Sequence, residues 1–264
     1  VGSEMCIRDR PGSLWGERSS EDLRQQIAQT RVVIVPIGST EQHGPHLPTG
    51  TDHIVAWELA KRVADRTGAL VLPLLPYGFS EDHFPRAGTI SLSAETLRAV
   101  VRDIVRSLSL NGVKHIVLLS GHAGHTFQLS DVCYEINVTG QPGSPKLHNL
   151  SPYSLLPMEV LGQVLQEEVF LHAEELETSL LLLLRPDLVD MKRAVKEIPP
   201  YLSKGLTTPN FLEWLRVFTT EKFLGRDPKT GIVGDATLAS KEKGEKILAM
   251  MVDVLVEAVK HATA

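Results

Sequence analysis

The stretch Arg31-Val-Val-Ile-Val-Pro-Ile-Gly38 decides the fold class of this 264-residue chain. It is a continuous apolar run, rich in β-branched residues, that ends at a glycine. A run without polar alternation is typical of a strand buried on both faces, as strands are in parallel sheets covered by helices. The stretch therefore predicts a central strand of an α/β fold.

Strand-like and helix-like segments alternate after this strand. Apolar runs at residues 69–75 and 113–119 predict two more buried strands. Apolar side chains at spacings of three and four predict a helix across residues 94–111, ended by Gly112, and another that stops at Gly68. This alternation predicts a layered α/β domain with a largely parallel sheet.

The second half of the chain is less regular. Prolines and glycines between Thr139 and Pro157 predict a loop excursion of the kind that covers a site. Residues 172–184 predict a helix with acidic residues at its start, and Asp235 is expected to cap the last helical region. Since no linker or repeat separates these segments, residues 11–264 are interpreted as a single domain.

Residues 1–10, VGSEMCIRDR, are interpreted as a non-native segment. They lack the long apolar run of a signal peptide, and they resemble a sequencing adapter translated as part of an assembled gene. Without Cys6 the chain has one cysteine, Cys133, which suits a structural thiol in a reducing compartment. The expected location is therefore cytoplasmic.

The overall composition excludes several classes of protein. With 42% hydrophobic and 22% charged residues, the chain reads as an ordinary globular sequence. Its formal net charge of −5 removes the electrostatic case for binding nucleic acid or an anionic membrane. No apolar run approaches the roughly 18 residues that a membrane span needs. The ten histidines then become the most informative residues.

The densest polar cluster, GSTEQHGPHLPTGTD at residues 38–52, follows the first buried strand. Loops that leave the carboxyl ends of parallel strands form the ligand crevice. Glu41 and His43 project to the same side of an extended backbone, and such a pair suits a divalent metal ion. Asp52 has two oxygens that could bridge two ions. The competing interpretation is that Glu41 and His43 are solvated and Asp52 only caps a helix.

Two later segments strengthen the metal interpretation. His122 leaves the third strand between Gly121 and Gly124, which permit close backbone approach. His172-Ala-Glu-Glu-Leu-Glu177 places three carboxylates near a histidine at a helix start, more than helix capping needs. Together these segments supply enough ligands for a two-metal site.

Five ordered motifs then carry a family resemblance, which runs from about Val32 to the last helix. They are GSTEQHGPHLPTGTD, YGFSEDHFPRAGTISL, SGHAGH, HAEELETSLLL and GIVGDATLASKEKGEK, and they resemble the creatininase (creatinine amidohydrolase) family of metal-dependent hydrolases. The resemblance implies a three-layer α/β/α sandwich, a homo-oligomer built as a hexamer, and two divalent metal ions. Zinc is the expected metal, with manganese or iron as alternatives. Known members hydrolyse carbon–nitrogen bonds of creatinine, a formamidopyrimidine and a modified precursor peptide.

The resemblance also implies a ligand set. One ion would be held by Glu41, Asp52 and His122, and the other by His43 and Asp52. In creatininase the second ion also takes a glutamate two residues after the strand-end histidine, where this chain has Gly124. Members with a small residue there carry a glutamate that corresponds to Glu175, so Glu175 is the expected fifth ligand, with Glu177 in reserve.

Catalytic and substrate-binding roles complete the expectation. His172 is predicted to protonate the leaving nitrogen, because histidine titrates near neutral pH, with Glu177 as a further catalytic candidate. Ser80, His83 and His125 are expected to contact the substrate, His83 lining the mouth of the site rather than binding metal. His125 and Glu174 depart from the asparagine and glycine that are common in the family.

The predicted function is hydrolysis of a non-peptide amide, such as a cyclic amide or a formamide, by a hydroxide held between two metal ions. The expected partner is a small-molecule amide substrate, with no nucleic acid and no membrane. The alternatives are a peptidase or deformylase in cofactor maturation, and a metal-binding member that has lost turnover. A phosphoesterase is disfavoured, because no arginine or lysine lies within the ligand-bearing motifs.

Overall fold

Four parallel strands form the central sheet of the computed structural model, which describes residues 12–167, 169, 171–199 and 228–263. The strands are β1 (Val32–Ile37), β2 (Leu70–Val71), β3 (His115–Ser120) and β4 (Lys146–Leu150), in the order β2-β1-β3-β4. β1 is central and pairs along its length with β3, so that Ile37 lies opposite Ser120. The apolar run at residues 31–38 therefore contains a central strand, as predicted.

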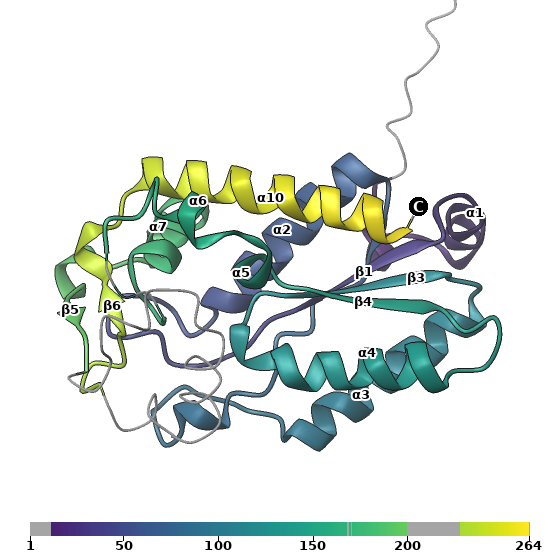
Figure 1. Cartoon of the computed structure of the whole chain (residues 1–264), viewed down its shortest axis with the longest axis horizontal. Coiled ribbons are helices and arrows are strands. Elements are labelled where there is room, and N and C mark those ends of the chain that lie inside the picture. The colour runs from purple at the N-terminus through teal and green to yellow at the C-terminus, as the bar shows by residue number, and fades with distance from the viewer. Residues whose placement is uncertain (1–11, 168, 170, 200–227, 264) are drawn as a thin grey trace, which may run out of the picture.

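Helices cover both faces of this sheet (Figure 1). Side chains of β1 alternate between two cores: Ile34 packs in the core with α2 (Thr51–Thr67), α7 (Glu175–Leu184) and α10 (Lys241–Thr263). Val33 and Val35 face the other core, which includes α1 (Ser20–Thr30), α3 (Ala94–Leu110) and α4 (Thr126–Thr139). Burying each such side chain contributes roughly 1.5–3 kcal/mol. The three-layer α/β/α sandwich is confirmed.

Several local predictions need correction. The stretch 139–157, predicted as a loop excursion, contains strand β4 and the short helix α5 (Pro152–Leu155), and α6 (Met158–Leu161) follows it. The sequence of β4, Lys-Leu-His-Asn-Leu, lacks the continuous apolar run of a buried strand. The reason is that β4 lies at the edge of the sheet and is only partly buried. Asp235 caps the 3₁₀ turn Ala236–Leu238 and not α10.

A second, two-stranded sheet joins β5 (Lys196–Glu197) to β6 (Gly234–Asp235) in antiparallel pairing. An isolated bridge between His172 and Val233 extends this connection toward α7. Residues 1–10 lie outside the described residues, so their interpretation stays a prediction, as does the single-domain boundary. Within the described ranges, no helix combines the length and apolar character that crossing a membrane requires.

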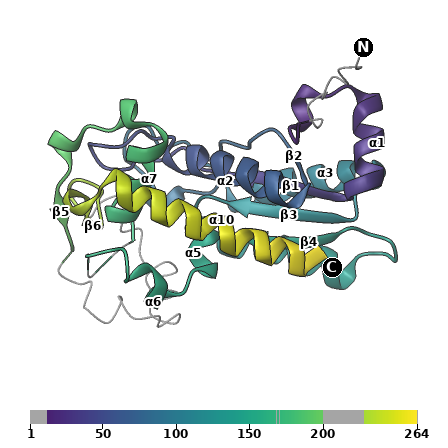
Figure 2. The same ribbon diagram turned by 90° about the horizontal axis from the view of Figure 1, so that it is seen from above.

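The strand ends and the first turn of α2 are packed tightly enough to fix a site. α10 runs alongside α2 and α7 over one face of the sheet (Figure 2). The start of α2 lies against the end of β3 at Gly121, where an added Cβ would overlap the carbonyl oxygen of Asp52 and crowd Ala56. Gly121 therefore allows Asp52 to lie next to the carboxyl ends of β1 and β3, as the sequence predicts for this glycine.

Candidate metal centre

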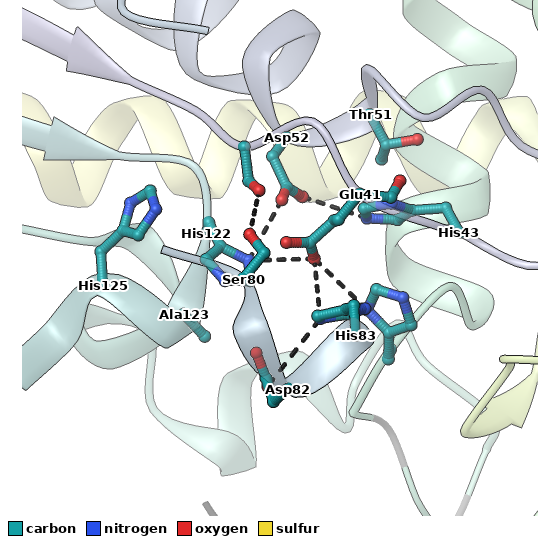
Figure 3. Close-up of polar contacts among 12 residues, drawn as sticks. Glu41, His43, Thr51, Asp52, Ser80, Asp82, His83, His122, Ala123 and His125 are labelled. Carbon is teal, nitrogen blue, oxygen red and sulfur yellow. Dashed lines mark hydrogen bonds and ion pairs between the residues drawn. The ribbon is translucent and has the colours of Figure 1, made fainter. Parts of the chain in front are cut away.

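Ligand-type side chains from the loop after β1, the start of α2 and the end of β3 converge at the carboxyl edge of the sheet (Figure 3). Glu41 and His43 lie on the loop after β1, Asp52 in the first turn of α2, and His122 directly after β3. Glu177 joins them from the first turn of α7. Exposed fractions of 0% for Glu41 and 1% for His43 show that neither is solvated, and the N-cap of α2 is Gly50 and not Asp52, which removes the competing interpretation of this loop.

Asp52 presents one carboxylate oxygen to each of two histidines. Its Oδ2 lies 3.1 Å from His122 Nδ1, and its Oδ1 lies 3.1 Å from His43 Nε2. His122 Nδ1 is also 3.1 Å from Glu41 Oε1, and His43 Nε2 is 3.6 Å from Glu177 Oε2. This is the arrangement that a carboxylate bridging two ions requires.

The unpaired oxygens of the cluster fit a cation. Glu41 Oε2 is buried without a hydrogen-bond partner among the described residues, and Glu41 Oε1 and Asp52 Oδ2 have only histidine nitrogens beside them, at 3.1 Å. A buried carboxylate in that state is costly unless a positive charge compensates it. Ligand atoms of His43, Asp52 and Glu177 lie within 4.8 Å of one another, and His122 Nδ1 lies 3.1 Å from both Glu41 and Asp52. The residues present therefore fit divalent metal ions.

The charges of the cluster's own side chains also favour a cation. Burial by itself lowers the pKa of His43, but Asp52 and Glu177 outweigh it and raise the pKa to about 10. Burial likewise opposes protonation of His122, and Glu41 and Asp52 outweigh it and hold its pKa well above the usual value. Without metal, protons on these two rings balance the carboxylates. Metal binding should therefore displace protons.

Glu175 does not reach this cluster, so the expectation that it supplies the fifth ligand is not met. Its carboxylate accepts hydrogen bonds from the backbone N–H groups of Gln166 and Glu167 at 2.8 and 2.9 Å, and it pairs with Lys243 of α10. Glu177 lies beside His43 instead and is oriented by the N–H of Ala173, which donates to Oε2 at 2.7 Å. Glu177, the reserve candidate, is therefore the α7 carboxylate that lies beside the cluster.

Gly124 and Glu174, which differ from the family pattern, each have specific contacts beside the cluster. A Cβ at Gly124 would overlap Nε2 of the His122 ring. If the His122 ring rotated to avoid this overlap, its Nδ1 would lose its contacts with Glu41 and Asp52. The Glu174 carboxylate caps α7, accepting from the N–H groups of Leu176 at 2.7 Å and Glu177 at 3.1 Å. Glu174 thus stabilises the turn that carries Glu177.

The three predicted substrate contacts occupy different environments. His83 is fully buried beside Glu41, and not at a mouth. The Ser80 hydroxyl is also buried and bonds to that of Ser39. Both nitrogens of His125 are engaged: Nε2 accepts from the N–H of Phe79 at 3.1 Å, so Nδ1 donates to Ser120 Oγ at 3.1 Å.

His125 points away from the cluster in Figure 3 and has no nitrogen left for a substrate. It links the end of β3 to the loop of Ser80, and the expectation of a substrate contact is not met. Its neighbour in that linkage, Gly78, leaves space for the imidazole, since a Cβ there would overlap Nε2. The sequence could not show this packing, because residues 78 and 125 meet only in the fold.

His172 faces the cluster with one nitrogen free. Its Nε2 donates to the carbonyl oxygen of Gln42 at 2.7 Å, and its Nδ1 lies 4.0 Å from Glu41 Oε1. Burial, together with the nearby His43 and His83, lowers the pKa of His172 well below its usual value. The ring is therefore neutral, with a lone pair on Nδ1 directed at the site.

Gln42 is a residue that sequence reasoning missed. Its backbone oxygen orients His172, and its amide reaches Gly231, 189 residues along the chain. Its position between Glu41 and His43 was the only available signal, and that position does not reveal which distant groups the amide contacts.

His46 supports the same loop from behind and predicts a pH effect. Its Nε2 bonds to Thr178 Oγ1 at 2.8 Å, and burial, with a contribution from His43, lowers its pKa to about 4. A histidine whose pKa is lowered by folding stabilises the folded state at pH values above its pKa in the unfolded chain, which is near 6.5. That stability is lost as the pH falls toward 4, by up to on the order of 3 kcal/mol. Urea unfolding of metal-free protein at pH 7 and pH 4 measures the loss.

The matched comparison is His46→Gln, whose amide can still bond Thr178 but does not titrate. It should lose less unfolding free energy between the two pH values than the wild type. His261→Gln, at an exposed position near the end of α10, should follow the wild type. An unchanged pH slope in His46→Gln would contradict the assignment.

The family model described as creatinine amidohydrolase matches residues 16–259. The chain is 34% identical to creatinine amidohydrolase of Pseudomonas putida, over 87% of this chain and 89% of that protein. It is 30% identical to the mycofactocin precursor peptide peptidase of Mycobacterium ulcerans, over 88% and 85%. A solved glutamate-to-glutamine variant of creatininase in a Zn–Zn form superposes with a TM-score of 0.78 at 31% identity, covering 96% of this chain and 98% of that one.

Proposed function

This chain belongs to the creatininase family of metal-dependent amidohydrolases, and from that premise we propose that it hydrolyses a small non-peptide amide at a two-metal centre. A cyclic amide or a formamide is the proposed substrate class. The observation that carries the proposal is the position of the Asp52 carboxylate between two histidines. One of its oxygens lies 3.1 Å from His122 and the other 3.1 Å from His43. Two buried half-sites sharing one carboxylate suit two ions and not one.

The proposed ligands differ from the expected set at one position. Glu41, Asp52 and His122 would hold one ion, and His43, Asp52 and Glu177 the other. Zinc is the proposed metal, with manganese or iron as alternatives, because carboxylate and imidazole ligands suit all three. When bound, the ions would lower the pKa of a water molecule toward neutrality and polarise the substrate carbonyl.

His172 is the proposed proton carrier. Because its Nε2–H is held by Gln42, the atom that exchanges protons is Nδ1, on the side of Glu41. A neutral ring must first accept a proton from the attacking water and can then donate it to the leaving nitrogen. The predicted general acid thus begins the cycle as a base. Glu177, a catalytic candidate in the sequence, is proposed as a ligand.

The ligand assignment is tested by a matched pair of variants, Glu177→Gln and Glu175→Gln. The first should lose about one ion per chain, because Gln is a poor ligand beside His43. The second should keep both ions but unfold at a lower temperature, since Lys243 loses a buried partner. Metal analysis after dialysis, with thermal unfolding, measures both. Retention of both ions in Glu177→Gln together with loss of one in Glu175→Gln would restore the original expectation.

The reaction is tested by assaying the metal-loaded protein against creatinine and other cyclic amides, formamides and short peptides. Turnover of a cyclic amide or a formamide is expected. Cleavage of peptides alone would favour the peptidase alternative, which the similarity to the mycofactocin precursor peptide peptidase supports. Two tightly held ions with no turnover of any compound would favour a metal-binding member without activity.

Cytoplasmic location and assembly into a homo-oligomer are further parts of the proposal. The resemblance to the family supports the assembly, and the single cysteine after residue 10 supports the location. Cys133 is buried, which raises the pKa of its thiol to about 12 and keeps it unreactive. Sedimentation analysis would measure the assembly.

A further inference from the structure

His83 lies close enough to the centre to be taken for a metal ligand. Its side chain is fully buried, and its Nε2 lies 3.1 Å from Glu41 Oε1. With Glu41 and His122 it forms a group whose ligand atoms all lie within 4.8 Å of one another. Yet Nε2 forms no hydrogen bond with any residue that the structure describes. A buried nitrogen in this state is either a metal ligand or a donor. The acceptor within reach of it, Glu41 Oε1 at 3.1 Å, belongs to a proposed metal ligand.

Gln42 decides between these two roles. Its Oε1 accepts from the backbone N–H of Gly44 at 3.1 Å, and its Nε2 donates to the carbonyl oxygen of Gly231 at 3.2 Å. The backbone N–H can only donate and the carbonyl oxygen can only accept. Exchanging the oxygen and nitrogen of the Gln42 amide would therefore lose both hydrogen bonds. The second proton on the amide nitrogen then faces His83 Nδ1, 3.3 Å away.

The orientation of Gln42 fixes the tautomer of His83. An amide nitrogen only donates, so Nδ1 of His83 must accept and carries no proton. The proton of the neutral ring is therefore on Nε2. A doubly protonated ring would set an N–H of Nδ1 against the amide N–H. A metal ion needs a lone pair, which Nε2 does not have in this arrangement.

We propose that His83 is a fixed hydrogen-bond donor to the substrate, and that Gln42 is the residue that fixes it. Its Nε2–H lies on the Glu41 side of the centre, and its ring packs edge-on to that of His172 with centroids 4.6 Å apart. The donor and the proton carrier thus border the same space. A donor held there would bond the carbonyl oxygen as negative charge develops on it. This step rests on the proposed function.

The test compares His83→Leu, which removes the donor, with His83→Gln, whose amide can still donate. Both variants should bind as many ions per chain as the wild type. With the amide that the wild type hydrolyses fastest, His83→Leu should lower kcat by about 10²- to 10³-fold, with a smaller change in KM. His83→Gln should recover part of that loss. Loss of an ion in both variants would show a ligand, and an unchanged kcat in His83→Leu would show that no contact is made.

Gln42→Leu tests the positioning step in a double-mutant cycle. If Gln42 acts through His83, its substitution should lower kcat in the wild type but have little further effect in His83→Leu. Additive losses would overturn the claim that Gln42 fixes the donor. If the wild type hydrolyses none of the amides, the proposed function fails. The metal counts of His83→Leu and His83→Gln still decide whether His83 is a ligand.

Discussion

Replacing Asp52 with alanine is expected to remove both metal ions and to reduce turnover to that of the metal-free protein. Asp52 is the only side chain among the described residues that faces both His43 and His122 at 3.1 Å. Without it each half-site keeps two proposed ligands, too few for tight binding of a divalent ion. Metal analysis after dialysis, with the activity assay, measures the result.

Two further variants separate the loss of a ligand from damage to the helix. Asp52→Asn keeps the size of the side chain but removes the charge, and it should also lose both ions. Asp65→Ala removes an exposed carboxylate from the same helix, α2, and should bind metal as the wild type does. Two ions retained in Asp52→Ala would refute a shared ligand at this position.

Replacing His172 with alanine should lower kcat by about 10²- to 10⁴-fold, the usual contribution of a positioned proton carrier, while both ions stay bound. The physical reason is the free Nδ1, which the bond from Nε2 to Gln42 directs toward the site. His172→Ala should also lose the pH dependence of kcat that this ring imposes. Kinetic profiles across pH, with metal analysis, measure both effects.

A metal count is essential here because His172 also lies near ligands. Its Nδ1 belongs with Glu41 and His43 to a group of atoms within 4.8 Å of one another. Loss of an ion in His172→Ala would therefore reassign this residue as a ligand. His261→Ala, at the exposed end of α10, is the matched control and should change neither kcat nor metal content.

Much of the fold could be predicted because its signals are local. The apolar runs of β1 and β3 and the spacing of α3 depend on neighbouring residues alone, and the structure confirms them. The cluster of Glu41, His43, Asp52 and His122 follows from the same local signals. Parallel strands bring their carboxyl ends to one edge, so residues just beyond β1 and β3 must meet.

The remainder depends on contacts between distant segments. Glu175 and Glu177 are two residues apart on the same turn of α7 and so point to different sides of the helix, and Glu175 is the one that faces Lys243 of α10. The edge position of β4 and the two bonds of His125 have the same cause. None of these partners can be identified from residues within a few positions of the side chain concerned.

Gly124 carries a consequence for how this centre could change over generations. In creatininase a glutamate at the corresponding position serves the second ion, but here any side chain at 124 overlaps the ring of His122. Gaining that glutamate first would disturb a ligand of one ion, and losing Glu177 first would weaken the other. Each single substitution is therefore expected to weaken metal binding. Lineages with either arrangement are therefore expected to keep the one they inherited, unless both positions change together.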